Sequence, residues 1–179
     1  MLHFVIGGAR SGKSRYAESL AQQQEDLGKK VFYIATTNSR RKDSNGQIDK
    51  EMLQRIEIHQ SERPSRWETI ETPVFLVQTL KQLDAENHCI LVDCLTLWTL
   101  NLMEDNTLLE QKKALLELLP ELSAKVVIVS NEVGMGIVPL GAFTRQYVDE
   151  LGWLHQAVAD CSDSVTFMLS GIPMSIKSS

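Results

Sequence analysis

The sequence predicts an α/β protein of three layers, in which a mostly parallel central sheet is flanked by helices. Two observations predict this fold class. Short apolar runs, rich in β-branched residues, are typical of the inner strands of a parallel sheet covered on both faces. These runs alternate with longer amphipathic stretches along the whole chain, which is the order expected of βαβ units.

The individual elements follow from these two patterns. Strands are predicted at Leu2–Ile6, Val31–Ala35, Cys89–Val92, Val126–Val129 and Val165–Leu169, with a weaker edge strand at Trp67–Ile70. Helices are predicted at Lys13–Leu27, Ile48–Glu62, Pro73–Leu83, Leu108–Leu122 and Phe143–Ala159. Gly28 ends the first helix, Pro64 ends the second, and Pro73 lies in the first turn of the third, where proline is tolerated.

Length and charge limit the classes of protein that fit. The 179 residues are expected to form one domain, residues 1–179, because no linker or internal repeat divides them. Hydrophobic residues at 43% exclude a disordered chain. The net charge of −5 argues against a protein that binds nucleic acid through a basic face.

The three cysteines and the hydropathy indicate a cytoplasmic protein. An odd cysteine count at this low density suits a reducing compartment, and Cys89 and Cys94 flank an apolar run that predicts buried thiols. No apolar stretch approaches the roughly 20 residues that a membrane span needs. A strand-like run follows Met1 at once, so no signal peptide is expected.

A phosphate-binding loop is the strongest motif in the chain. It matches G-x-x-x-x-G-K-[ST] through Gly7, Gly8, Ala9, Arg10, Ser11, Gly12, Lys13 and Ser14. A predicted strand precedes it and a predicted helix follows, so its backbone amides and the helix N-terminus would form an anion site. Lys13 would reach the β- and γ-phosphates, and Ser14 would bind Mg2+.

An acidic partner for this loop is expected at the end of a neighbouring strand. Asp93 directly follows the predicted strand Cys89–Val92 and could hold Mg2+ through water. The alternative is that Asp93 caps the helix after it. The chain lacks the Asn-Lys-x-Asp motif of Ras-type GTPases, and its size favours phosphoryl transfer to a small molecule.

The segment between the predicted strands Val31–Ala35 and Trp67–Ile70 contains two features whose roles the residues alone do not decide. Asn38–Gln47 has no apolar residue and predicts a surface loop, whose basic residues either are solvated or touch phosphates. His59 falls on the apolar stripe of the predicted helix Ile48–Glu62, with Arg55 and Arg63 one turn away on either side. It is either a core histidine or a nucleophile for a phosphorus centre, with the arginines neutralising phosphate oxygens.

Several further segments give the chain a family resemblance over nearly its whole length. They are Tyr33-Ile34-Ala35-Thr36, Arg55-Ile56 before His59, Arg63-Pro64, Trp67 with Glu71, Asp93-Cys94-Leu95-Thr96, Asn101-Leu102, Ser130-Asn131-Glu132-Val133-Gly134-Met135-Gly136-Ile137-Val138-Pro139 and Ser170-Gly171-Ile172-Pro173. With the phosphate loop, they make the chain resemble the bifunctional adenosylcobinamide kinase / adenosylcobinamide-phosphate guanylyltransferase family of cobalamin biosynthesis. The segment NEVGMGIVP is the most specific, since generic P-loop kinases lack it.

The resemblance implies a RecA-like P-loop NTPase fold and two activities. A nucleoside triphosphate, GTP or ATP, phosphorylates the aminopropanol hydroxyl of adenosylcobinamide, and GTP then donates GMP to the new phosphate through a guanylylated histidine. By position, His59 matches that histidine. The nucleotide contacts implied are residues 7–14 together with Ala35, Thr36, Thr37, Gln60, Ser61, Glu62, Arg63, Glu71 and Asp93. The family also implies a homotrimer, and His155 stands where its pattern has Asn.

Overall fold

The computed structural model describes residues 1–38 and 64–178. Its core is one seven-stranded sheet with the strand order β3-β2-β4-β5-β1-β6-β7. The strands are β1 (Leu2–Gly7), β2 (Lys30–Ala35), β3 (Glu68–Glu71), β4 (His88–Asp93), β5 (Lys125–Asn131), β6 (Ser164–Leu169) and β7 (Ile172–Lys177). All neighbouring pairs are parallel except β6 and β7, which form an antiparallel hairpin.

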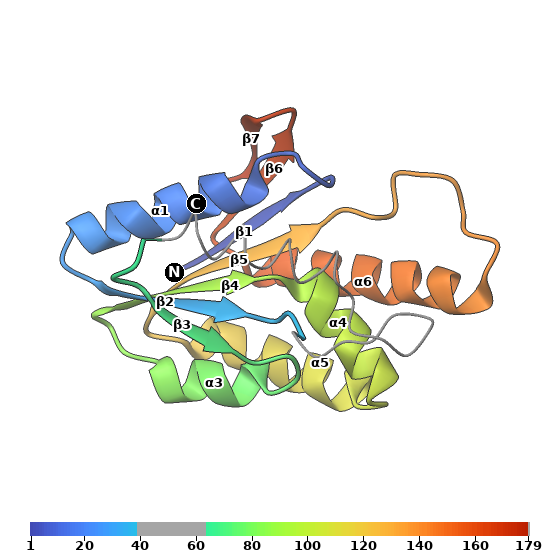
Figure 1. Cartoon of the computed structure of the whole chain (residues 1–179), viewed down its shortest axis with the longest axis horizontal. Coiled ribbons are helices and arrows are strands. Elements are labelled where there is room, and N and C mark those ends of the chain that lie inside the picture. The colour runs from blue at the N-terminus through green and yellow to red at the C-terminus, as the bar shows by residue number, and fades with distance from the viewer. Residues whose placement is uncertain (39–63, 179) are drawn as a thin grey trace.

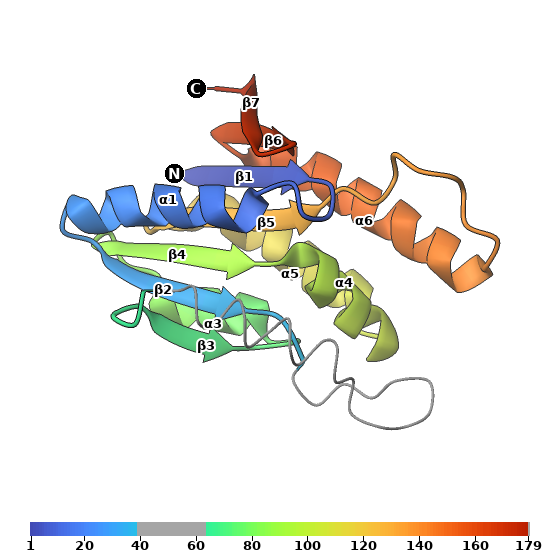
Figure 2. The same ribbon diagram turned by 45° about the horizontal axis from the view of Figure 1, so that its top comes forward.

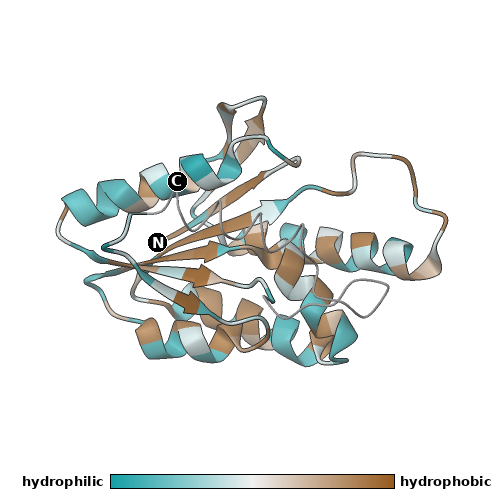
Figure 3. Ribbon diagram, viewed as in Figure 1, coloured by the Kyte–Doolittle hydropathy of each residue, from teal (hydrophilic) through white to brown (hydrophobic). Residues whose placement is uncertain are grey.

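Helices cover both faces of this sheet (Figures 1 and 2). They are α1 (Lys13–Asp26), α3 (Leu76–Leu83), α4 (Leu95–Glu104), α5 (Leu108–Leu118) and α6 (Ala142–Cys161), with a 3-10 turn, η1, at Leu119–Glu121. Helix α1 lies on one face, where Ala17 and Ala21 pack against strand residues such as Val5. The other helices cover the opposite face and share one apolar core. Figure 3 shows the apolar strands between these layers.

The predicted three-layer fold is confirmed, and so are the predicted strands. The weak edge strand is β3, which lies at one end of the sheet. The helix predicted over Leu108–Leu122 ends as an α-helix at Leu118, because Pro120 lacks an amide hydrogen and the chain continues as a 3-10 turn. The predicted helix Ile48–Glu62 and loop residues 39–47 lie outside the described residues.

Two elements were missed by the sequence patterns. In helix α4 the polar residues Thr96, Thr99 and Asn101 are buried together with the leucines, so it lacks the exposed polar face on which a periodic pattern depends. Strand β7 contains Pro173 and is exposed at every residue, which is compatible with an edge strand and not with an inner one.

The strand register brings the carboxyl ends of the inner strands together. Ala35 lies opposite both Glu71 and Asp93, and Gly7 lies opposite Asn131. In open α/β sheets this edge is where ligands bind. The sheet therefore aligns the phosphate loop, which follows β1, with the residues that end β3, β2, β4 and β5.

Two smaller predictions can also be checked. Cys89 and Cys94 are buried free thiols, as predicted, and burial raises the pKa of each to about 11. Across residues 1–38 and 64–178, no helix combines the length and apolar character that crossing a membrane requires.

Candidate nucleotide-binding site

The phosphate loop connects β1 to α1, and its backbone requires glycine at two positions. Gly12 has φ +91°, a conformation that L side chains rarely adopt. At Gly7, an added Cβ would overlap the carbonyl oxygen of Met168 and lie 2.9 Å from Ser11 Oγ. The loop is also tied to its neighbours, because Glu132 N–H donates to Gly7 O at 2.9 Å and Gly171 N–H donates to Ser11 O at 3.0 Å. Its shape is thus fixed by the surrounding fold.

Lys13 begins α1 with a buried side chain that is folded back onto the loop. Its Nζ donates to Gly8 O at 2.6 Å, and the residue is only 7% exposed. Burial lowers the pKa of Lys13, while the charge of Asp93 and the nearby Cys94 raise it. A cation held by a single carbonyl can exchange that oxygen for a phosphate oxygen, which would be a stronger charge-assisted partner.

Asp93 lies beside the first turn of α1, as its predicted role requires. Its Oδ2 accepts hydrogen bonds from Ser14 Oγ at 3.2 Å and from the Tyr33 hydroxyl at 2.7 Å. The N-cap residue of α4 is Cys94, and the Asp93 carboxylate is bonded to α1 and β2 instead of serving as that cap. Tyr33 was missed as a site residue, because only the pairing of β2 with β4 shows that its hydroxyl reaches Asp93.

The Ser14 and Asp93 oxygens fit a magnesium ion. Mg2+ prefers hard oxygen ligands and is commonly held by one or two protein groups together with phosphate oxygens and water. No group of three or more His, Cys, Asp or Glu side chains that could bind a metal occurs among the described residues. Oxygens of a bound nucleotide and water would fill the other coordination positions.

The end of β2 is fastened to the start of α4. Thr36 is fully buried; its hydroxyl donates to Cys94 O at 2.6 Å and accepts from Cys94 N–H at 2.8 Å. Asn101, a further residue that the sequence reasoning did not assign, donates to Thr36 O and Pro73 O. Ala35 is also buried, whereas Thr37 is partly exposed. The Thr36 hydroxyl therefore has a structural role, and nucleotide contacts at Ala35, Thr36 and Thr37 stay predictions.

The remaining predicted site residues divide into two groups. Ala9, Arg10 and Glu71 are exposed at the carboxyl edge, and Arg10 has φ +56°. His59 and its neighbours Gln60, Ser61, Glu62 and Arg63 lie outside the described residues. The structure thus brings together residues 7–14, Asp93 and the ends of β2 and β3, while the histidine remains a prediction.

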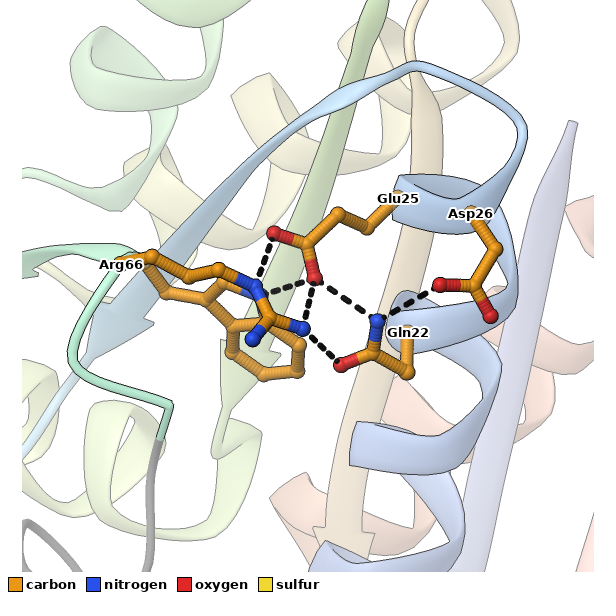
Figure 4. Close-up of polar contacts among 5 residues, drawn as sticks. Gln22, Glu25, Asp26 and Arg66 are labelled. Atoms are coloured by element: carbon orange, nitrogen blue, oxygen red, sulfur yellow. Dashed lines mark hydrogen bonds and ion pairs between the residues drawn. The ribbon is translucent and has the colours of Figure 1, made fainter.

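The chain re-enters the described part at Pro64 and is at once anchored to the far end of α1 (Figure 4). Arg66 donates to both oxygens of Glu25 at 2.6 and 2.7 Å and to Gln22 Oε1 at 2.7 Å. The Trp67 indole also donates to Glu25, at 3.1 Å. The Arg66 hydrogen bonds are the main reason that the pKa of Glu25 falls to about 2. This contact fixes the chain between residue 63 and β3.

Solved structures resemble this fold at low sequence identity. A KaiC-like protein from Pyrococcus horikoshii is 14% identical with a TM-score of 0.50, covering 93% of this chain and 69% of that one. The flagellar accessory protein FlaH from Methanocaldococcus jannaschii is 13% identical with a TM-score of 0.50, covering 99% and 78%. These similarities concern the fold alone and agree with the predicted RecA-like P-loop NTPase architecture.

Sequence relatives carry more information. The bifunctional adenosylcobalamin biosynthesis protein CobP of Pseudomonas aeruginosa is 47% identical over 99% of this chain and 98% of its own length. The protein CobU of Escherichia coli, with the same bifunctional description, is 34% identical over 99% of this chain and all of its own length. The family model described as cobinamide kinase / cobinamide phosphate guanyltransferase matches residues 3–176. The chain belongs to the cobinamide kinase / cobinamide phosphate guanyltransferase family.

Proposed function

We propose that the protein catalyses two successive reactions on a corrinoid. It phosphorylates the aminopropanol hydroxyl of adenosylcobinamide with a nucleoside triphosphate. It then transfers GMP from GTP to adenosylcobinamide phosphate, giving adenosylcobinamide-GDP and pyrophosphate. The observation that carries the proposal is the phosphate loop with Lys13 and the Ser14–Asp93 pair at one sheet edge, in a chain whose family performs both reactions.

Each part of this edge has a role in handling a triphosphate. The first N–H groups of α1 and the loop amides would bind phosphate oxygens, and Lys13 would neutralise charge on the β- and γ-phosphates. Ser14 and Asp93 would hold Mg2+, which supplies further charge neutralisation when it is bound. Because the whole protein carries a net charge of −5, attraction for the triphosphate has to come from these local groups.

The guanylyl transfer is proposed to proceed in two displacements at the α-phosphorus of GTP. A ring nitrogen of His59 attacks that phosphorus and pyrophosphate leaves with the electron pair of the broken bond. A phosphate oxygen of adenosylcobinamide phosphate then attacks the same phosphorus and His59 leaves. Gln60–Arg63, Thr37 and Glu71 are proposed to contact the nucleotide during these steps.

A plain P-loop kinase of another small alcohol, with His59 only structural, is the alternative. The family is described by both a kinase and a guanylyl transfer activity, so this alternative is not favoured.

The nucleotide used in each step and the oligomeric state also stay part of the proposal. GTP serves the guanylyl step, and either ATP or GTP serves the kinase step. The assembly is proposed to be a homotrimer, supported by exposed apolar side chains of the kind that subunits cover, such as Ile137, Leu140 and Ile172. Sedimentation at several concentrations tests the trimer.

A cytoplasmic location and one domain that serves both reactions remain predictions from the sequence.

Product analysis tests the proposed function. The wild-type protein, Mg2+, GTP and adenosylcobinamide should give adenosylcobinamide phosphate first and adenosylcobinamide-GDP later, identified by mass. The variant His59→Asn should stop at the phosphate. A variant that still forms adenosylcobinamide-GDP at the wild-type rate would show that His59 is structural, and a wild-type protein that forms neither product would contradict the proposal.

A further inference from the structure

A buried hydrogen-bond chain crosses from α4 to α6 beneath the carboxyl edge. Asn131 N–H donates to Thr96 Oγ1 at 2.7 Å, and Thr96 Oγ1 lies 3.1 Å from Ser130 Oγ. Ser130 Oγ in turn lies 2.7 Å from His155 Nε2. The other ring nitrogen, Nδ1, faces Glu132 Oε2 at 3.9 Å. Thr96, Ser130 and His155 are all buried, so this chain is shielded from water.

The first bond of this chain has a fixed direction. A backbone amide can only donate, so Thr96 accepts there and its own hydrogen can go to Ser130. Ser130 donates to Nε2 of the imidazole in the tautomer that carries its hydrogen on Nδ1. Burial lowers the pKa of His155 to about 4, so the ring is neutral near pH 7 and has one N–H. In that tautomer the hydrogen lies on the nitrogen that faces the Glu132 carboxylate.

The Glu132 carboxylate accepts one backbone hydrogen bond and has the His155 ring beside it. Its Oε1 accepts from the Gly134 N–H, and its Oε2 faces the His155 ring. The side chain is 21% exposed, so part of the carboxylate remains open to solvent or to a ligand. Each carboxylate oxygen has two lone pairs, and these contacts leave lone pairs unused.

The sheet places Glu132 in the middle of the nucleotide-binding edge. It directly follows β5, which lies between β1 with the phosphate loop and β4 with Asp93. Its backbone N–H donates to Gly7 O, the first residue of the loop. Asp93 is already engaged by Ser14 and Tyr33, and Glu71 ends β3, at the outer edge of the sheet. Glu132 is thus the carboxylate of the described part that is both central and open.

We propose that Glu132 is the proton acceptor of the kinase step, an inference that rests on the proposed function. The acceptor hydroxyl oxygen forms a bond to the γ-phosphorus, and the bond from that phosphorus to the β,γ-bridging oxygen breaks. The leaving nucleoside diphosphate keeps the electron pair, and the hydroxyl proton goes to Glu132. Guanylyl transfer needs no such acceptor, because its nucleophiles are a neutral imidazole and an ionised phosphate.

The test compares the two half-reactions in Glu132→Gln. Glutamine keeps an oxygen for the Gly134 N–H but is a far weaker base. Kinase turnover is measured with γ-labelled GTP and adenosylcobinamide, and guanylylation is measured with α-labelled GTP alone. The matched control is Glu121→Gln, an exposed carboxylate in η1, which precedes β5 at the opposite edge of the sheet. Glu132→Asp is the conservative variant.

The expected result is a selective loss. In Glu132→Gln, kinase kcat should fall about 100-fold, within the range typical of general-base catalysis, while KM for GTP and guanylylation change less than about threefold. Glu132→Asp should recover part of kcat, and Glu121→Gln should match wild type. Wild-type kinase turnover in Glu132→Gln, or an equal loss of both half-reactions, would overturn the inference. A wild-type protein without kinase turnover would overturn the proposed function itself.

Discussion

The two ends of α1 differ in how their polar groups are satisfied. At the C-terminal end, the Glu25 carboxylate accepts from Gln22, Arg66 and Trp67 (Figure 4). At the N-terminal end, Ser11 Oγ is buried with no hydrogen-bond partner among the described residues, and the Lys13 ammonium is bonded to a loop carbonyl. The first end anchors the chain, while the second leaves polar groups that a phosphate can satisfy. An unsatisfied buried group is costly, and a phosphate oxygen bound in this loop would give Ser11 Oγ a partner.

Replacing Lys13 should disable phosphate binding at the N-terminal end of α1, while the contacts at its C-terminal end stay intact. In Lys13→Ala, kcat for kinase turnover and for guanylylation should each fall about 100- to 1000-fold, because a preorganised group that stabilises transition-state charge is lost. Circular dichroism and urea unfolding should show a folded protein. Activity within tenfold of wild type would contradict the role given to Lys13.

The loop backbone is tested by Gly7→Ala. The new Cβ would overlap the Met168 carbonyl, which belongs to the sheet and cannot move aside easily. The free energy of unfolding should fall by about 2–3 kcal/mol, as is usual for overpacking. The control is Gly136→Ala, where the added Cβ meets nothing within 4 Å. Equal stability of the two variants in urea would show that the close approach at Gly7 is not limiting.

His155 lies beside the nucleotide-binding edge of the sheet and is buried, so its effect should be on stability. Burial lowers the pKa of His155 to about 4 in the folded protein, from its ordinary value of 6.5. Between these values the unfolded chain binds more protons, so the free energy of unfolding should fall by about 2–3 kcal/mol as pH drops from 6.5 to 4.

Burial also lowers the pKa of His3, which adds a decline of the same sign. The variant His155→Asn should therefore show a shallower decline than wild type in urea unfolding measured across this pH range. Parallel curves for the two proteins would show that His155 does not contribute to this pH dependence.

A substitution at the C-terminal end of α1 should have the smallest effect on the free energy of unfolding. The Arg66 side chain is 59% exposed, so solvent screens its ion pair with Glu25. Glu25→Gln should reduce the free energy of unfolding by about 1 kcal/mol or less at pH 7, with Glu121→Gln as control. Because the pKa of Glu25 is lowered from 4.5 to about 2, its contribution should vanish as pH falls through that range. A loss near 3 kcal/mol would show that the contact is more than an anchor on the surface.

The features predictable from sequence are those encoded locally. The strands and the phosphate loop follow from short patterns, and Asp93 follows from its position at a strand end. The Tyr33–Asp93 and Arg66–Glu25 contacts join residues 60 and 41 positions apart, so they depend on strand register and helix placement. Helix α4 and strand β7 were missed because one has no exposed polar face and the other is exposed throughout.

One nucleotide site is proposed to serve both reactions, and the guanylyl transfer alone passes through a covalent His59 intermediate. The most direct measurement incubates the protein and Mg2+ with GTP labelled at the α-phosphate and, separately, at the γ-phosphate. The account predicts an acid-labile, alkali-stable protein adduct that carries the α label alone and is absent from His59→Asn. A γ-labelled adduct, an adduct that persists in His59→Asn, or no adduct under turnover conditions would contradict it.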